Sequence, residues 1–245
     1  GAAAPTPYFL TTSQLVNIHD HLILIDCGEG CQLTLRKLKL KFQRIKIILI
    51  SHMHADHVMG LPGLLASMNL LGRKIPIEVY GPEELEDFVK TIWHKTGTHI
   101  DFPINFNVVD AKKPSMLVEM KSYKIQAFPT KHRVETCGFR IEELAGSWSL
   151  KPETKDLFNL NYHEINLLKK GIPVIRKGGV IVDPTKCCIA SEKPRSYVFA
   201  ADTAFTPKVV IAANDATLLY HEATFMESEK IIAKKTMHST ASDAG

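Results

Sequence analysis

The alternation of short apolar runs with helical patterns predicts an α/β fold for this 245-residue chain. Hydrophobic residues make up 45% of the chain and charged residues 23%, which is the composition of an ordinary globular domain. The run Arg44 to Ser51 is rich in β-branched residues and has the pattern of a strand buried on both faces. We therefore expect one α/β domain, with two sheets or one mixed sheet and helices outside.

Strands and helices alternate through the first half of the sequence. The expected elements are a strand at 21–26, a helix at 30–40, a strand at 44–51, a helix at 60–71, a strand at 77–80 and a helix at 83–95. Pro62 suits the first turn of its helix, where its missing N–H leaves no helical hydrogen bond unmade. Acidic residues at the start of the 83–95 helix interact favourably with the helix macrodipole.

The second half of the sequence is dominated by strands and contains one irregular stretch. Strands are expected within 104–143, including 123–128 and 136–142, and then a strand at 197–201, a helix at 207–213 and a strand at 217–220. Serine, lysine and proline punctuate residues 147–194 without a clear period. We expect this stretch to be a loosely structured insertion into a single domain that spans residues 1–245.

The charges and cysteines exclude several classes of protein. With 30 Lys+Arg and 26 Asp+Glu, the formal charge is +4. Five scattered cysteines do not form a disulfide framework, so we expect reduced, buried thiols and a cytoplasmic protein. No window approaches the roughly 18 apolar residues of a membrane span, and Gly1 to Tyr8 lacks the pattern of a signal peptide. No membrane partner is expected.

A basic stretch lies between Glu29 and Asp56, where the chain has no acidic residue. Its cations are Arg36, Lys37, Lys39, Lys41, Arg44 and Lys46. Two interpretations stay open: a solvated helix face with the turn that follows it, or a patch that binds a polyanion.

Four potential metal ligands lie within segment 51–57 (SHMHADH), directly after the strongest predicted strand. His52 and His54 are two residues apart, so in extended backbone they point to the same side. Asp56 and His57 lie where the chain turns and can face another direction. Neutral imidazoles and a carboxylate are ligands that suit zinc. Two ligand directions from one short loop predict two metal ions rather than one.

Segment 52–57 (HMHADH) resembles the HxHxDH signature of the metallo-β-lactamase-fold hydrolases, and the whole chain resembles the ribonuclease Z family of tRNA 3′-processing endonucleases. Similar segments follow in order: 2–7 (AAAPTP), 26–30 (DCGEG), 51–65 (SHMHADHVMGLPGLL), 129–139 with its histidine, 201–203 (ADT), 221–225 (HEATF) and 238–240 (HST). HEAT followed by HST is close to family-specific. The resemblance implies an αββα four-layer sandwich of two mixed β-sheets with helices on the outer faces.

The resemblance also implies a role for each candidate ligand. One zinc ion would be held by His52, His54 and His132. The other would be held by Asp56 and His57, and Asp202 would bridge the pair, since one carboxylate can span two cations. Asp56 would also orient or deprotonate the attacking water. Asp26, at the end of the first predicted strand, would support the ligands from behind.

The remaining candidates concern the leaving group and the RNA. Glu222 and His238 would form a hydrogen-bonded proton donor, in which the carboxylate raises the pKa of the imidazole. Candidate contacts to substrate phosphates are Lys131 and Arg133 beside the third histidine ligand, and Lys169, Lys170, Arg176 and Lys177 in the insertion. This insertion occupies the place of the arm with which the family grips tRNA, although a tip rich in glycine and proline is not recognisable.

The resemblance further implies features outside the sequence given. The family has a strand before the position of Gly1, and the last histidine of its second zinc site lies in a segment beyond His238-Ser239-Thr240. We therefore expect a longer chain; within residues 1–245 the second site is one ligand short.

The leading hypothesis is a zinc-dependent endoribonuclease that removes the 3′ trailer of precursor tRNA, by attack of a metal-activated water on a phosphodiester. The family resemblance implies that it acts as a homodimer. One alternative is a two-zinc phosphodiesterase of the same fold that acts on small or cyclic phosphodiesters, since the fold does not fix the substrate. Another is an RNA-binding relative that has lost one zinc.

Overall fold

The computed structural model describes residues 3–245, so that the beginning of segment 2–7 lies outside the described part. Two compact units are present: one contains the chain up to Ile141 together with Ser196–Gly245, and the other is Glu142–Arg195. All the candidate metal ligands lie in the larger unit. Among the described residues, no helix has the length and apolarity that crossing a membrane requires.

The first sheet of the larger unit has the strand order β1-β2-β3-β4-β5. Its strands are β1 (Gln14–Ile18), β2 (His21–Ile25), β3 (Ile45–Leu49), β4 (Ile77–Gly81) and β5 (Ile104–Val108). β1 pairs antiparallel with β2, and the later neighbours pair in parallel. The connections include the helices α1 (Cys31–Lys37), η1 (Phe42–Arg44), α2 (Ala55–Val58), α3 (Leu61–Leu70) and α4 (Leu85–Thr96).

The second sheet of the larger unit has the order β14-β13-β8-β7-β6. Its strands are β6 (Ser115–Glu119), β7 (Tyr123–Pro129), β8 (Cys137–Glu143), β13 (Ser196–Ala200) and β14 (Leu218–His221). β6 and β7 are antiparallel, whereas β13 and β14 are parallel and are joined by α8 (Pro207–Ala213). The chain continues through η2 (Glu227–Glu229), α9 (Lys230–Thr236) and α10 (Ala241–Ala244).

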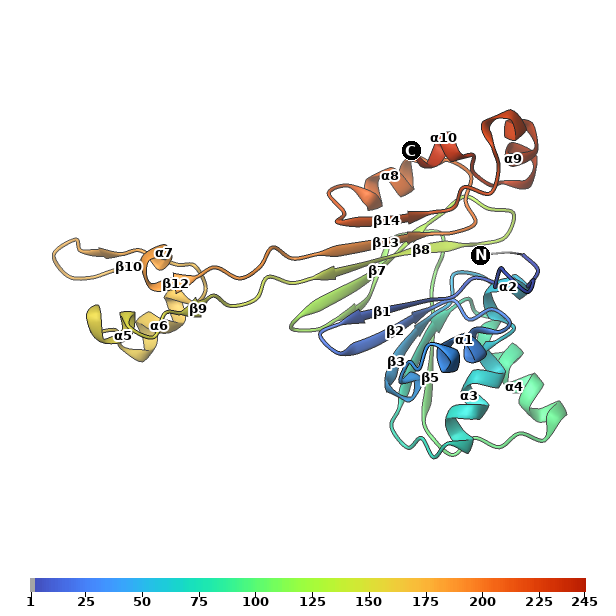
Figure 1. Cartoon of the computed structure of the whole chain (residues 1–245), viewed down its shortest axis with the longest axis horizontal. Coiled ribbons are helices and arrows are strands. Elements are labelled where there is room, and N and C mark those ends of the chain that lie inside the picture. The colour runs from blue at the N-terminus through green and yellow to red at the C-terminus, as the bar shows by residue number, and fades with distance from the viewer. Residues whose placement is uncertain (1–2) are drawn as a thin grey trace. The chain divides into compact units, whose positions relative to one another are not determined.

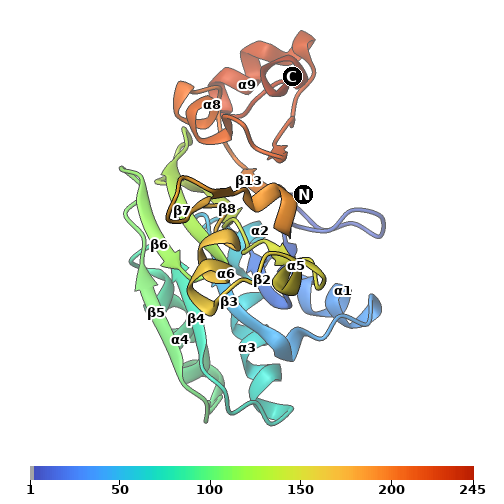
Figure 2. The same ribbon diagram turned by 90° about the vertical axis from the view of Figure 1, so that its left-hand side faces the viewer.

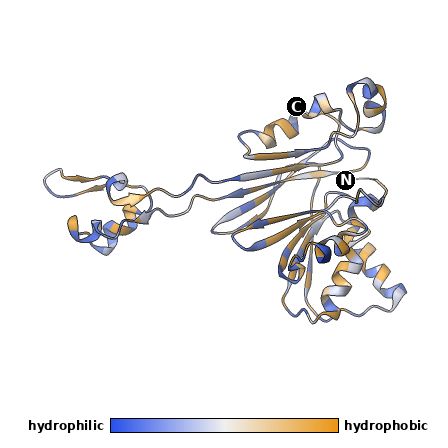
Figure 3. Cartoon of the chain, viewed as in Figure 1, coloured by the Kyte–Doolittle hydropathy of each residue, from blue (hydrophilic) through white to orange (hydrophobic). Residues whose placement is uncertain are grey.

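Three apolar layers hold these elements together. Along β2, Leu24 packs towards the helices of the first sheet, whereas Ile23 and Ile25 pack against the second sheet. On the far side of the second sheet, Val198 packs with Val209 of α8. Figures 1 and 2 show the helices on the outer faces of the two sheets, and Figure 3 shows hydrophobic residues along the strands. The expected four-layer αββα arrangement is confirmed.

The smaller unit has its own core, and the prediction of a loosely structured stretch was wrong. Its elements are β9 (Ser149–Leu150), α5 (Thr154–Leu157), α6 (Tyr162–Leu168), β10 (Val174–Ile175), β11 (Ile181–Val182), α7 (Pro184–Cys187) and β12 (Cys188–Ile189). Leu168, Val174 and Cys187 are among its buried residues. Strands of two residues cannot display an alternating pattern, which explains why the sequence showed no period.

The other expected elements agree with the structure within a few residues at each end. β1 was not predicted, because its sequence QLVNI is mostly half-buried and alternates only weakly. The five cysteines are free and buried, as expected.

Candidate metal centre

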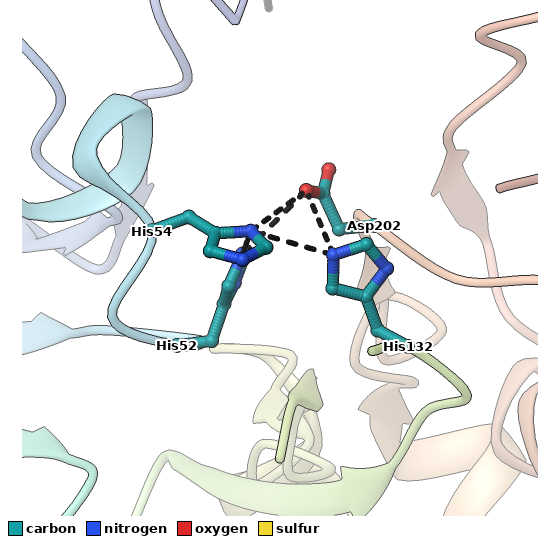
Figure 4. Close-up of side chains that lie close together, drawn as sticks. All are labelled: His52, His54, His132 and Asp202. Atoms are coloured by element: carbon teal, nitrogen blue, oxygen red, sulfur yellow. Dashed lines mark hydrogen bonds and ion pairs between the residues drawn. The ribbon is translucent and has the colours of Figure 1, made fainter. Parts of the chain in front are cut away.

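The candidate ligands all follow the carboxyl ends of strands in the larger unit. His52 comes three residues after β3 ends, His132 three residues after β7 and Asp202 two residues after β13. The two sheets thus bring residues that are far apart in sequence close together within the larger unit. Figure 4 shows His52 and His54 from one loop facing His132 and Asp202 from two others.

Four of these side chains have the spacing of a single metal shell. His52 Nε2 and His54 Nδ1 lie 2.9 Å apart, and His132 Nε2 lies 3.4 Å from the same His54 atom. The Oδ2 atom of Asp202 is 3.5 Å from His52 Nε2, 3.7 Å from His132 Nε2 and 3.9 Å from His54 Nδ1. Ligands bound at 2.0–2.1 Å in a tetrahedron lie about 3.3–3.4 Å apart. The observed spacings bracket this value.

A second group shares the same carboxylate oxygen. His57 Nε2 lies 3.5 Å from Asp202 Oδ2 and 3.4 Å from Asp56 Oδ2. Asp202 therefore belongs to both groups, which is the position of a bridging carboxylate. Its backbone φ of 47° lies in the left-handed region, a conformation that costs energy for a non-glycine residue and is common at functional sites.

Asp26 explains why His57 presents its Nε2 atom to this group. The buried Asp26 carboxylate accepts hydrogen bonds from His57 Nδ1 at 2.7 Å, from the Ser51 amide at 2.8 Å and from Ser51 Oγ at 3.0 Å. His57 Nε2 is then a buried atom without a hydrogen-bond partner among the described residues. A buried polar atom is expected to have a partner, and a cation between Asp56, His57 and Asp202 would provide it. Asp26 thus holds the ring of His57, the contact expected of a residue that supports this candidate ligand.

The other imidazoles are also oriented from behind. His52 Nδ1 lies 3.0 Å from Ser51 Oγ, and His132 Nδ1 donates to the carbonyl of Met237 at 3.1 Å. Such outer partners fix which ring nitrogen faces a metal. Ser51 and Met237 were not predicted as supporting residues, because a serine and a backbone carbonyl carry no recognisable ligand pattern in a sequence.

The electrostatics of this cluster favour a bound cation. Burial lowers the pKa of His54 and of His132, so both imidazoles are neutral, as ligands must be. Burial opposes ionisation of Asp202, but the nearby imidazoles of His52 and His57, each 3.5 Å from its Oδ2, hold the pKa of this carboxyl well below the usual range. For His57, burial lowers the pKa, but the neighbouring Asp26, Asp202 and Asp56 carboxylates together raise it to about 12. Carboxylates that attract a proton this strongly attract a metal cation as well.

Gly28 allows residues 51–57, which we call the metal loop, to lie against segment 26–30 (DCGEG). A Cβ atom at this position would lie 2.1 Å from the carbonyl oxygen of Asp56 and 2.2 Å from Thr11 Oγ1. No side chain fits there without moving backbone. The close approach lets Cys27 donate a backbone hydrogen bond to His57 at 2.7 Å. Donor type, spacing, the surplus of carboxylates and the supporting hydrogen bonds all fit a metal centre.

Glu222 and His238 lie beside this cluster and form a pair. His238 Nδ1 donates to Glu222 Oε1 at 2.7 Å, and the His238 ring centre is 5.0 Å from that of His132. The hydrogen bond from His238 to Glu222 raises the pKa of His238, so the ring is charged more readily than a free histidine. The geometry is that of a proton donor held at the edge of the centre.

Glu222 does not have the surroundings of a metal ligand, although one of its oxygens lies within reach of Asp202. Its Oε1 also accepts from the Thr203 amide at 2.7 Å, and its Oε2 accepts from Thr224 Oγ1 at 2.6 Å and from the Ser239 amide at 3.2 Å. These bonds occupy the carboxylate. They hold His238 in place and tie the HEAT, HST and ADT segments together.

The predicted phosphate contacts fall into two groups. Lys131 and Arg133 are exposed and flank His132. Lys170 and Lys177 are exposed in the smaller unit and Lys169 is half-buried there. Arg176 instead pairs with Glu164 through two nitrogens, at 2.7 and 2.9 Å. Its guanidinium is used inside the smaller unit, beside the cap of α6.

Comparisons with known sequences agree with this centre. Residues 1–153 match the family model described as "Anti-Pycsar protein Apyc1". The chain is 35% identical to a ribonuclease Z from Parabacteroides distasonis over 244 residues, covering 100% of this chain and 80% of that protein. It is 37% identical to a ribonuclease Z from Phocaeicola vulgatus over 245 residues, covering 100% and 79%.

Solved structures show the same fold. The short form of human tRNase Z superposes with a TM-score of 0.71 at 25% identity, covering 100% of this chain and 83% of that one. A metallo-β-lactamase fold protein from Bacillus subtilis superposes with a TM-score of 0.62 at 16% identity, covering 98% and 74%. Because its sequence is 35% and 37% identical to these two ribonuclease Z proteins across the whole chain, and its fold matches that of human tRNase Z, the chain belongs to the ribonuclease Z family of metallo-β-lactamase-fold proteins.

Proposed function

We propose that this chain is a metal-dependent endoribonuclease that cleaves precursor tRNA at its 3′ end and removes the 3′ trailer. The observation that carries the proposal is the Glu222–His238 pair beside the cluster of His52, His54, His132 and Asp202. The similarity to ribonuclease Z proteins over the whole chain supports the same activity. A centre of this kind suits hydrolysis of a phosphodiester.

Two zinc ions per chain are part of this proposal. His52, His54 and His132 would hold one, Asp56 and His57 the other, and Asp202 would bridge them. When bound, the ions would polarise the scissile phosphate and lower the pKa of the attacking water. The shared Oδ2 atom of Asp202 supports this division, because it lies 3.5 Å from both His52 Nε2 and His57 Nε2.

The protein's own side chains have three tasks in this reaction. Asp56, with a pKa lowered against the effect of burial by its contact with His57, stays ionised and accepts a hydrogen bond that orients the water. His238, charged through Glu222, donates its proton to the leaving oxygen. Lys131 and Arg133 contact phosphates near His132.

The larger assembly is proposed from the family. We place Lys169, Lys170 and Lys177 of the smaller unit on the body of the tRNA, with Arg176 as a structural neighbour. We further propose a homodimer that acts in the cytoplasm. Sedimentation of the purified protein tests the dimer, and salt dependence of tRNA affinity tests the lysines, because each phosphate contact steepens that dependence.

The decisive experiment measures cleavage of a precursor tRNA with a 3′ trailer by the zinc-loaded protein. His54→Ala removes a ligand from the middle of the cluster and is expected to abolish cleavage. His94→Ala is the matched control, because His94 is exposed on α4. Bound zinc is measured on the same samples, and loss of zinc by His54→Ala alone supports the ligand assignment.

Other outcomes would redirect the proposal. Retained cleavage by His54→Ala would contradict the metal centre. Fast turnover of a cyclic or chromogenic phosphodiester without cleavage of precursor tRNA would assign the chain to small phosphodiesters instead. A folded wild-type chain that binds tRNA without cutting it would favour a non-catalytic RNA-binding protein.

A further inference from the structure

An exposed aromatic loop precedes β1 in the larger unit. We call Tyr8, Phe9 and Leu10 the aromatic loop; their exposed fractions are 89%, 69% and 47%. The loop is held by Thr6, whose amide donates to the Phe9 carbonyl at 2.7 Å and whose Oγ1 accepts from the Phe9 amide at 2.9 Å. Large apolar side chains that a defined turn presents to solvent point to a contact surface.

This loop is anchored to the metal centre at its far end. The Thr12 amide donates to the Asp56 carbonyl at 3.2 Å, and the Thr12 carbonyl accepts from the Gly28 amide at 3.1 Å. Thr11 Oγ1 donates to the Glu29 carbonyl at 2.7 Å. Phe9 is three residues before Thr12, so its Cα lies within about 10 Å of the Thr12 Cα. The aromatic loop therefore stands at the rim of the centre.

The aromatic loop lies against the start of a helix whose other end is basic. Leu10 Cδ2 lies 3.7 Å from where a Cβ of Gly30 would be, which places the loop against the start of α1. α1 exposes Leu33 and ends with Arg36 and Lys37, and Lys39 and Lys41 follow it, all exposed. Exposed aromatic rings combined with exposed cations bind single-stranded nucleic acid, through base stacking and phosphate contacts.

On another side of the metal loop, beyond Arg133, acidic residues outnumber basic ones. A cleft of about 1270 Å³ adjoins Met53 and is lined by Glu83, Glu84, Asp87, Asp110 and Glu135 with Lys112 and Arg133. Lys112 is already paired with Glu135 at 2.7 Å. The excess of carboxylates repels phosphates, so an RNA strand that leaves the centre is favoured along the basic side, past the aromatic loop.

We propose that Tyr8 and Phe9 form a stacking platform for an unpaired base of the RNA strand close to the scissile phosphate. This inference rests on the proposed function and adds a positioning site to it. Each of the four bases has an aromatic face, so stacking would hold the strand in place without selecting its sequence. The basic end of α1 would hold the phosphates that follow.

The test combines two variants with base deletion in the substrate. Tyr8→Leu/Phe9→Leu keeps an apolar surface but removes both rings, and leaves the backbone bonds of Thr6 intact. We expect KM for precursor tRNA to rise about tenfold, with kcat little changed, since stacking on one aromatic residue is worth that much. Leu70→Ala, at another exposed apolar position of the larger unit, is the control and is expected to leave KM unchanged.

An abasic scan through the cleavage region locates the base. One abasic position is expected to raise KM about tenfold for wild type and to add nothing in the double variant. In addition, 2-aminopurine at that position is expected to be quenched on binding to metal-free wild type in EDTA, and not on binding to the double variant.

The failures of the two proposals are distinguishable. If wild type does not cleave precursor tRNA, the proposed function is overturned. If wild type cleaves, but the double variant has wild-type KM and shows no coupling to any abasic position, the stacking platform is overturned. A double variant that changes from dimer to monomer without coupling would assign the aromatic loop to contact with a second copy of the chain, which also overturns it.

Discussion

Asp26 holds three groups of the metal loop with one buried carboxylate: both the amide and the hydroxyl of Ser51, and the Nδ1 of His57. None of these contacts touches a substrate. They fix the tautomer of His57 and the path of the loop, so that the geometry of the cluster depends on a residue from a neighbouring strand.

Asp26→Asn is expected to weaken zinc binding about 10–100-fold, because the amide cannot hold His57 and Ser51 as the carboxylate does. Competition with a zinc chelator measures this change. Asp20→Asn is the control, because the Asp20 side chain is exposed and makes only a long ion pair, with its Oδ1 3.9 Å from Arg44 Nη2. Equal affinities in the two variants would contradict the supporting role of Asp26.

The proton donor gives a second prediction, on pH dependence. The Glu222 carboxylate raises the pKa of His238 above the ordinary value. The charged ring is the acid, so the proposed activity is retained below that raised pKa and lost as pH rises through it. Glu222→Gln removes the negative charge, and the alkaline fall of kcat is expected to move to lower pH.

His238→Ala is expected to lower kcat about 10²–10⁴-fold, the usual contribution of a general acid. Bound zinc should stay at the wild-type amount, because Glu222 keeps its bonds to Thr203 and Ser239. Zinc loss in this variant would instead place His238 among the ligands. Rate profiles and metal analysis on the same preparations separate the two roles.

At the scale of elements, the approach of the metal loop to β2 depends on Gly28. Gly28→Ala would force a Cβ to 2.1 Å from the Asp56 carbonyl. The expected destabilisation is about 1–3 kcal/mol or more, as for other overpacked sites. Thermal unfolding measures it, together with weaker zinc binding.

Gly63→Ala in α3 is the control, and it is expected to raise the free energy of unfolding rather than lower it. A Cβ at Gly63 meets no atom within 4 Å. Replacing a helical glycine by alanine stabilises by roughly 0.5–1 kcal/mol. If Gly28→Ala is as stable as Gly63→Ala, the close contact between Gly28 and the Asp56 carbonyl does not contribute to stability.

The smaller unit is an independent structural element with a thin core. Leu168 is fully buried among residues of that unit alone. Leu168→Ala is expected to cost the unit about 2–5 kcal/mol and to open residues 142–195 to protease and hydrogen exchange. Strand amides of the larger unit should keep their protection. Loss of protection across β2 and β3 would contradict two separately folded units.

At the scale of the whole molecule, the centre joins two sheets. His52 and His57 come from the loop after β3, whereas His132 and Asp202 follow strands of the second sheet. A metal bound here can be held only when both sheets are in place, so binding adds to the free energy of unfolding.

Zinc is expected to raise Tm by an amount that corresponds to about 2.7 kcal/mol at a hundredfold excess over Kd. The shift should disappear in His54→Ala and on addition of EDTA. Calorimetry with and without zinc measures it. A zinc-dependent shift that persists in His54→Ala would place the stabilising ion elsewhere in the chain.

Much of this protein is determined by local sequence. β-branched runs such as 45–49, and helices with a proline in the first turn such as Pro62 or Pro207, follow from periodicity and capping, because each of these patterns lies within a single element. The spacing of the histidines in segment 51–57 predicts a metal-binding loop. The ribonuclease Z resemblance supplied His132, Asp202, Glu222 and His238, which no local pattern would have connected.

Only the tertiary structure decided how these residues meet. The shared Oδ2 of Asp202, the hydrogen-bond role of Glu222 and the use of Arg176 inside the smaller unit depend on contacts between strands that are far apart in the chain. The core of residues 142–195 and the anchoring of the aromatic loop at Asp56 were likewise invisible in the sequence. The physical reason is that such contacts are fixed by packing and backbone hydrogen bonds between elements, and these leave no periodic trace in one sequence.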